Sequence, residues 1–258
     1  MKILVCLKQV PHKDARLEVD ASGTWIQDDG IKFEINDYDT YGIEEALRIK
    51  DAGEAEVVVI TVGPDRTSQA LRTALGMGAD RAIQIWDDAL ASTDPLGIAK
   101  ILAAVAKEES PDLIFMGLMS DDGNNAVVGP MLAHLLDMPS ATGVMSAKLD
   151  GGAITVEREL EGGALEVVKL PTPCLLAVQT GMNEVRYASL KGIMQAKKKP
   201  LDTKSLSDYG LDAGVVAAKV SIEKLYVPEK GDGAEILSGS ADEVAQQLTG
   251  KIKELGLL

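Results

Sequence analysis

The 258-residue sequence has few aromatic, cysteine and histidine residues. Aromatic side chains make up only 3% of it, so its core must be aliphatic, as is typical of parallel strands covered by helices. The two cysteines, Cys6 and Cys174, stand far apart and form no CxxC motif, which indicates neither a disulfide framework nor a zinc site. Since the only histidines are His12 and His134, we expect no metal site.

Positive charge is also scarce. The chain has 26 Lys and Arg residues against 40 Asp and Glu residues, a formal net charge of −14. Nucleic acids and anionic membrane surfaces are bound by basic patches, so this balance argues against both as partners. Solubility alone would explain the charge, and so would a partner protein with a positive surface.

Long apolar runs are missing as well. No stretch approaches the roughly 20 residues of a membrane-spanning helix. The apolar start at residues 3–7 lacks the length and the cleavage site of a signal peptide. We therefore expect no membrane insertion and a reducing, cytoplasmic compartment.

Short apolar runs and helical patterns alternate through the first half of the chain. This alternation predicts an α/β fold with a doubly wound, mostly parallel, Rossmann-like sheet and right-handed crossovers. The predicted strands are residues 3–7, 56–62, 82–86 and 113–116, and the predicted helices are residues 43–53, 67–77, 95–109 and 129–136.

Further strands are predicted outside this alternation. Residues 16–35 alternate loosely around turn signals and predict an exposed β-hairpin. After Pro139, short apolar runs are separated by Gly-Gly pairs, which predicts an antiparallel patch that completes the main sheet. These runs are residues 144–149, 154–159, 165–170 and 175–178.

Regular spacing is lost after Gly181 and returns only in a helical pattern at residues 242–255. A tail of this length without a core of its own favours contact with another subunit. We therefore divide the chain into an α/β nucleotide-binding domain, residues 1–181, and a docking loop with a partner-wrapping extension, residues 182–258.

Three polar or glycine-containing segments follow predicted strands, where ligands bind in doubly wound sheets. Residues 121–125 precede a helix, so they either bind a phosphate through backbone N–H groups or form an ordinary polar cap. Residues 36–39 either contact a base or ribose or cap a helix. Gly63 and Pro64 either leave room for an adenine or form a plain turn. Because neither GxGxxG nor GxxxxGK[ST] occurs, a phosphate site here would rely on backbone groups.

The segment NEVRYASLKGIMQAKKKP, residues 183–200, places apolar side chains among charged ones. Leu190, Ile193 and Met194 lie between Arg186 and three consecutive lysines. An exposed apolar anchor with a charged rim is typical of a docking loop. The alternative is an amphipathic helix that packs on its own domain.

This segment resembles the signature of electron transfer flavoprotein β subunits. The similar residues are Arg186–Leu190, then Ile193, Met194 and residues 196–199. The resemblance spans nearly the whole chain. Other similar segments are residues 5–9, 36–39, 44–46, 71–75, 78–82 and 157–163.

The resemblance implies a heterodimer with an α subunit that holds most of a redox-active FAD. The β subunit of this family buries an AMP and has no catalytic residues of its own. Its docking loop presents a leucine, here Leu190, to flavin-containing dehydrogenases of the acyl-CoA or amine type. The residues implied in AMP binding are Cys6, Asn36, Asp37, Tyr38, Asp39, Val62, Gly63, Asp122, Gly123, Asn124, Asn125, Ala126 and Val127. Those implied in docking are Arg186, Tyr187, Leu190, Ile193 and Met194.

Two other functions compete with this one. Electron-bifurcating members of the family hold a second FAD in place of AMP, oxidise NADH there, and carry a DGDTAQVGP loop. This chain reads DGNNAVVGP at residues 122–130, and the three replacements favour AMP. The third possibility is a stand-alone nucleotide-binding protein, which the tail without a core argues against.

Overall fold

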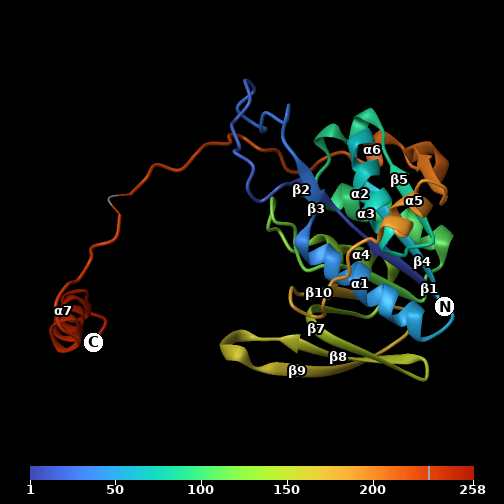
Figure 1. Ribbon diagram of the computed structural model, residues 1–258. Helices are drawn as coiled ribbons and strands as arrows, with labels where there is room; N and C mark the ends of the chain where they lie inside the picture. Colours follow the sequence, from blue (N-terminus) through green and yellow to red (C-terminus); the bar gives the residue numbers. More distant parts are fainter. Residues whose placement is uncertain (232) are drawn as a thin grey trace. The chain divides into compact units, whose positions relative to one another are not determined.

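The structure is a computed structural model that describes residues 1–231 and 233–258 (Figure 1). The chain forms two compact units. One contains Met1–Leu17 and Asp28–Ile222, and the other contains Glu18–Gln27 and Glu223–Leu258. The candidate site and the docking loop both belong to the first unit.

A sheet of nine strands runs through the first unit in the order β11-β5-β4-β1-β6-β10-β7-β8-β9. All pairs from β11 to β7 are parallel, and β7, β8 and β9 are antiparallel. The predicted doubly wound, mostly parallel sheet is therefore confirmed. The strands are β1 (Lys2–Cys6), β4 (Glu56–Val62), β5 (Arg81–Ile85), β6 (Leu113–Gly117), β7 (Ser140–Asp150), β8 (Ala153–Glu159), β9 (Leu165–Pro171), β10 (Cys174–Val178) and β11 (Leu201–Lys204).

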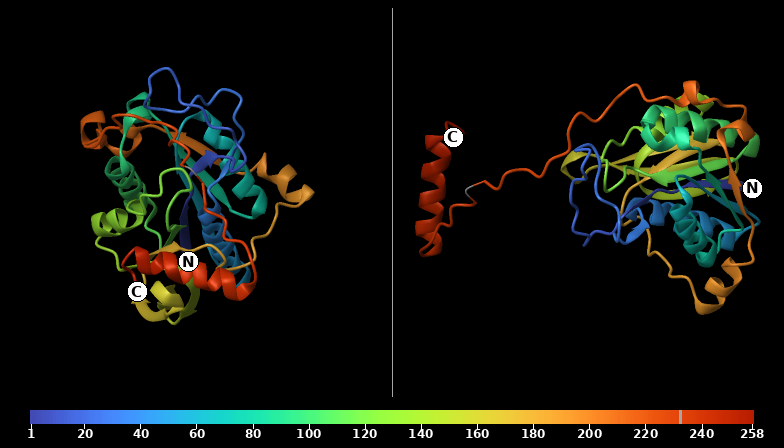
Figure 2. Two further views of the ribbon diagram at one scale, coloured as in Figure 1. Left: turned by 90° about the vertical axis from the view of Figure 1, so that its left-hand side faces the viewer. Right: turned by 90° about the horizontal axis from the view of Figure 1, so that it is seen from above.

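Helices cover both faces of this sheet (Figure 2). Successive residues of β1 point to opposite faces, so Ile3 and Val5 pack in one aliphatic cluster and Leu4 in the other. The first cluster lies under α1 (Asp37–Ala52) and α2 (Ser68–Met77), and the second lies under α3 (Pro95–Glu109) and α4 (Val128–Leu136). Short 3-10 turns complete the unit: η1 (Asp65–Thr67), η2 (Asp88–Ser92), η3 (Glu161–Gly163) and η4 (Leu206–Tyr209).

One strand prediction was wrong in its pairing, and the predicted hairpin is shorter than expected. Residues 175–178 form β10, which is parallel to both of its neighbours, β6 and β7, and does not belong to the antiparallel patch. The hairpin predicted over residues 16–35 is reduced to one bridge between Val19 and Ile26. Hydrogen bonds from the Ser22 backbone and hydroxyl to Asp20 organise that turn locally, and such bonds compete with a strand ladder.

A separate small sheet pairs β2 (Gln9–Pro11) with β3 (Phe33–Ile35) in antiparallel fashion. This pairing holds the segment that follows β1 next to the segment that precedes α1, and so contributes to the position of both segments.

The first unit continues well past residue 181. α5 (Leu190–Ala196), β11 and α6 (Ala213–Val216) all belong to it. The second unit contains α7 (Ala241–Glu254), close to the helix predicted at residues 242–255. In the described parts of the chain, no helix combines the length and the apolar character needed to cross a membrane.

Candidate functional site

The carboxyl ends of β1 and β6 meet at the point where the strand order reverses. From β1 the sheet extends through β4 and β5 on one side and through β6 and β10 on the other. Chain segments that leave neighbouring strands in opposite directions open a crevice at such a switch point. Residues 7–8 after β1, residues 36–39 before and within α1, and residues 118–127 after β6 come together there.

Asn36 fastens the loop that follows β6. Its side-chain Nδ2 donates to the Met119 carbonyl oxygen at 2.9 Å, and its Oδ1 accepts from the Asp121 backbone N–H at 2.9 Å. Although Asn36 occupies the N-cap position of α1, its side chain makes no capping bond. Of the two alternatives for residues 36–39, side-chain capping does not hold for Asn36, because both polar atoms of its amide are used across the crevice.

Asp39 joins β1 to β6 from the first turn of α1. One carboxylate oxygen accepts from the Lys8 backbone N–H at 2.7 Å, and the other accepts from the Gly117 N–H at 2.8 Å. Burial raises the pKa of Asp39 to about 7, although both hydrogen bonds act in the opposite direction. Gly117 permits this close approach, because a Cβ there would collide with the Asp39 carboxylate and with Cβ of Tyr38.

Lys8 supplies a positive charge in the crevice. Its Nζ lies 2.6 Å from Oδ1 of Asp122 and 3.3 Å from Oγ of Ser120. Burial acts to raise the pKa of Asp122, but the Lys8 charge and the hydrogen bonds from Lys8, Ser120 and the Gly123 N–H together hold the pKa below its usual value. On the α1 side, the Asp37 N–H donates to Asp121 at 3.2 Å. Burial, and then the Asp121 charge, raise the pKa of Asp37 and that of Tyr38.

Residues 122–126 form an exposed loop, and the half-buried Val127 joins it to α4. Asn124 and Ala126 adopt left-handed backbone conformations, with φ of 49° and 52°. Within residues 1–231 and 233–258, the backbone N–H groups of Asn125, Ala126 and Val127 donate no hydrogen bond. Free N–H groups at the start of a helix, where the macrodipole is positive, can bind an anion.

The other residues predicted at strand ends lie beside this crevice. Cys6 is buried at the end of β1, and burial raises the pKa of its thiol. It therefore acts as a small core residue. Gly63 follows β4, one strand away, and its N–H and carbonyl oxygen bond to Ile85 and Gln84. These bonds join Gly63 to β5.

Two residues of the crevice, Lys8 and Gly117, were absent from the predicted site. Together with Asp121 of the predicted segment 121–125, they make the contacts that hold the two sides of the crevice together. The sequence signal for Lys8 was available, because it is a lone cation directly after the first buried strand. The close approach at Gly117 depends on a residue 78 positions away, which no local pattern reveals.

The segment of residues 183–200 packs on its own domain and also exposes apolar side chains. α5 packs on α2 through Gly192, which faces Gly76. Three side chains nevertheless remain largely exposed: Tyr187 at 96%, Leu190 at 83% and Met194 at 71%. Ile193 is half-exposed, and Arg186 is partly buried in ion pairs with α1.

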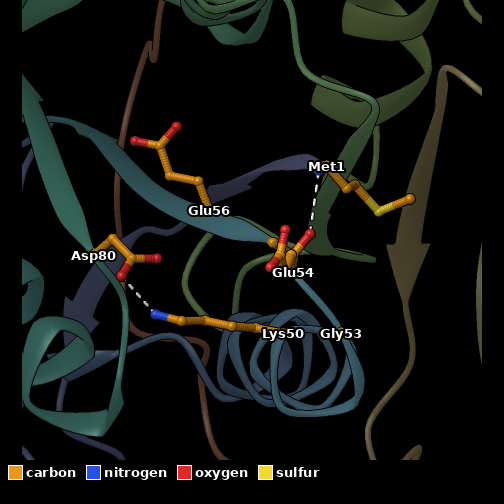
Figure 3. A pocket seen from close by; sticks show the side chains of 7 residues that line it. Met1, Lys50, Gly53, Glu54, Glu56 and Asp80 are labelled. Atoms are coloured by element: carbon orange, nitrogen blue, oxygen red, sulfur yellow. Dashed lines mark hydrogen bonds and ion pairs between the residues drawn. The ribbon is translucent and has the colours of Figure 1, made fainter.

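A hollow of different character lies at the amino ends of the strands (Figure 3). Lys50 crosses it to bind Asp80 at 2.5 Å, and the N-terminal ammonium donates to the Glu54 carbonyl oxygen at 3.2 Å. The carboxylates of Glu54 and Glu56 also line it. No group of three or more His, Cys, Asp or Glu side chains in the described chain is placed to hold a metal ion.

Comparison with known proteins identifies the family of this chain. The family model of the electron transfer flavoprotein domain matches residues 24–209, which include most of the residues described above. The electron transfer flavoprotein subunit beta of Methylophilus methylotrophus is 39% identical over 98% of both chains. The subunit of the same name from Bradyrhizobium diazoefficiens is 41% identical over 88% of this chain and 90% of its own, and that of Bacillus subtilis is 35% identical over 98% of both. The chain therefore belongs to the electron transfer flavoprotein family, among its β subunits.

Proposed function

We propose that this chain forms a heterodimer with an electron transfer flavoprotein α subunit, binds AMP structurally, and helps to pass electrons from flavin-containing dehydrogenases. The observation that carries the AMP proposal is the loop of residues 118–127. Asn36 holds it across the switch point, and its backbone N–H groups beyond Asn124 remain free.

The crevice fits the components of an adenine nucleotide. A phosphate would bind the N–H groups of Asn125, Ala126 and Val127 at the start of α4. The carboxylates of Asp37 and Asp121 would accept hydrogen bonds from ribose hydroxyls and would repel a phosphate. The Lys8 ammonium offsets the negative charge of Asp122 beside the loop. The mixture of acidic groups and free N–H groups therefore suits a nucleotide with a single phosphate.

The redox chemistry would come from FAD, which supplies the two-electron acceptor and would be held mainly by the α subunit. This chain would contribute support and recognition. The carboxylates of Asp39, Asp121 and Asp122 all serve local contacts, which suits a carrier subunit better than a catalyst.

The second unit has the surface of a segment that covers another protein. Exposed apolar side chains recur along it, among them Tyr226, Val227, Ile236, Leu248 and Leu255. Exposed apolar surface on this scale favours burial against a partner. We propose that residues 223–258 wrap the α subunit.

The segment of residues 183–200, called the docking segment from here on, would bind the dehydrogenase. Burial of the Leu190 side chain would contribute roughly 1.5–3 kcal/mol, enough to anchor a complex that still dissociates. We expect Leu190→Ala in the heterodimer to raise the dehydrogenase concentration needed for half-maximal flavin reduction roughly ten-fold or more. The bound nucleotides should not change.

The matched control is Leu165→Ala, which removes another exposed leucine, on β9. Flavin bleaching by a dehydrogenase that reduces the wild-type heterodimer gives the measurement. The control should behave as wild type. Equal concentration dependence for all three proteins would contradict docking through Leu190.

A further inference from the structure

Arg186, at the start of the docking segment, has its hydrogen-bond donors turned toward α1. Its Nε and Nη2 donate to the two carboxylate oxygens of Glu44, at 2.8 and 3.0 Å, and its backbone N–H donates to the same carboxylate at 3.1 Å. The remaining terminal nitrogen, Nη1, lies 2.8 Å from Oδ2 of Asp51. The planar guanidinium is thus bound at both ends in a bidentate geometry that favours arginine.

Glu44 makes this contact from a buried position. Its side chain is only 5% exposed, whereas that of Asp51 is 62% exposed. A buried carboxylate is costly without a charged partner, so Arg186 and Glu44 depend on each other. Glu44 lies two turns before Asp51 on α1, and the fork of the guanidinium spans both.

The same segment is held at further points. Asn183 Nδ2 donates to the Tyr41 carbonyl oxygen and to Oε2 of Glu45, both at 3.1 Å. At the other end of the segment, side chains bind carbonyl oxygens in both directions between α2 and the end of α5. Arg72 of α2 donates to the carbonyl oxygens of Ala196 and Lys199. Lys199 in turn donates to the carbonyl oxygens of Leu75 and Ala79.

Between these anchors, the apolar side chains point outward. The Ser189 hydroxyl accepts from the Gly192 N–H at 3.0 Å and starts α5 at Leu190. Leu190 and Met194 are four positions apart, so they lie on one face of the helix, and Tyr187 is almost fully exposed. The exposed face is therefore built on a frame that hydrogen bonds and ion pairs hold within the first unit.

We infer that Arg186 is a positioning residue: it acts through Glu44 to hold the docking segment on α1 and does not itself contact the dehydrogenase. This inference rests on the proposed docking function. It revises the role that the family resemblance implied for Arg186, and it leaves Tyr187, Leu190, Ile193 and Met194 as the contact residues. A surface held in its binding conformation loses less entropy on association.

The test compares Arg186→Gln, Glu44→Gln and the double variant in the complete heterodimer. A dehydrogenase that reduces the wild-type protein serves as the probe. If Arg186 acts through Glu44, each single variant should raise the half-saturating dehydrogenase concentration by a similar factor, roughly ten-fold. The double variant should be no worse than either single variant, and the limiting rate should not change.

Two further variants show that the effect is specific. Asp51→Asn removes the exposed partner only, so we expect a smaller shift from a protein that folds normally. Arg158→Gln breaks a comparable ion pair with Glu166 on the β8–β9 hairpin and should have no effect on docking.

A direct contact would give a different pattern. In that case Arg186→Gln would weaken docking whereas Glu44→Gln would not, or the factors of the two single variants would multiply in the double variant. Either result would overturn the inference.

A second readout separates this inference from the docking proposal itself. Trypsin cleavage after Lys191 in the heterodimer, followed by mass spectrometry, reports how firmly the segment is held. We expect faster cleavage in Glu44→Gln and Asp51→Asn than in wild type, whatever Leu190→Ala does to electron transfer. Unchanged cleavage in Glu44→Gln would contradict the positioning role, whereas unchanged transfer in Leu190→Ala would contradict docking alone.

Discussion

At the scale of single residues, the raised pKa of Asp39 links the crevice to the pH dependence of stability. Its buried carboxylate binds the N–H groups that follow β1 and end β6. These bonds favour the ionised form, yet burial prevails and raises the pKa to about 7, from an ordinary 3.8. The folded protein therefore binds this proton more tightly than the unfolded chain does.

The sign of the resulting pH dependence follows directly. The stability contributed by Asp39 is fully present below about pH 4 and is lost as the pH rises to about 7. We expect the difference in unfolding free energy between wild type and Asp39→Asn to move in favour of the variant over this range. The change should be on the order of a few kcal/mol. Urea unfolding at pH 4 to 8 measures it, and a difference independent of pH would contradict the assignment.

Lys8 is the second decisive residue, because it neutralises Asp122 next to the proposed phosphate position. Lys8→Met keeps the aliphatic portion of the side chain and removes the charge. We expect AMP affinity to fall roughly ten-fold or more, as for the loss of a charged hydrogen bond. Calorimetric titration of nucleotide-depleted heterodimer with AMP is the measurement.

A matched control for this change is Lys32→Met, which removes an exposed lysine of the segment between β2 and β3. It should bind AMP as wild type does. If Lys8→Met binds AMP as tightly as Lys32→Met and wild type do, the phosphate lies elsewhere.

At the scale of elements, local signals decided which predictions were confirmed. The helix predicted at residues 95–109 has those bounds in the structure. Pro95 fits the first turn, and the Asp94 side chain caps the Gly97 N–H at 2.9 Å. Both signals lie within a few residues of the helix start, so the sequence contains them.

Elements whose pairing is not local were predicted less well. β10 follows β9 in the chain but inserts between β6 and β7, so its direction could not be read from the neighbouring turns. In the crevice, the side-chain amide of Asn36 hydrogen-bonds the backbone of residues 83 and 85 positions away. Residue type indicated a polar site at the strand ends, but only the fold shows which polar atoms meet.

The contact between α2 and α5 gives a prediction at this scale. A Cβ on Gly192 would collide with the Gly76 carbonyl oxygen. We therefore expect Gly192→Ala to lower the unfolding free energy by about 1–3 kcal/mol, as overpacking does, and to weaken docking. Urea unfolding and the bleaching assay measure the two effects.

Gly250→Ala is the control for this variant. Gly250 lies in α7, and a Cβ there meets no atom within 4 Å. Its unfolding free energy should stay the same or rise slightly, because alanine favours a helix. If Gly192→Ala is as stable as this control, the close packing of α2 and α5 does not contribute to stability.

At the scale of the whole molecule, different regions of the chain serve different tasks. The doubly wound sheet forms the crevice at β1 and β6, α5 would present residues of the proposed docking surface, and residues 223–258 would cover the α subunit. The net charge of −14 fits either solubility or a positive partner surface. The identity of the nucleotide proposed for the crevice matters most for function, because AMP there would imply a plain electron carrier and a second FAD would imply a bifurcating enzyme.

The most direct way to identify that nucleotide is to measure the nucleotide content of the heterodimer. The chain is co-purified with its α partner, the complex is denatured, and the released nucleotides are quantified by chromatography. We expect one FAD and one AMP for each heterodimer. Two FAD and no AMP would contradict the proposed function, and would mean that the loop at residues 122–130 holds a second flavin.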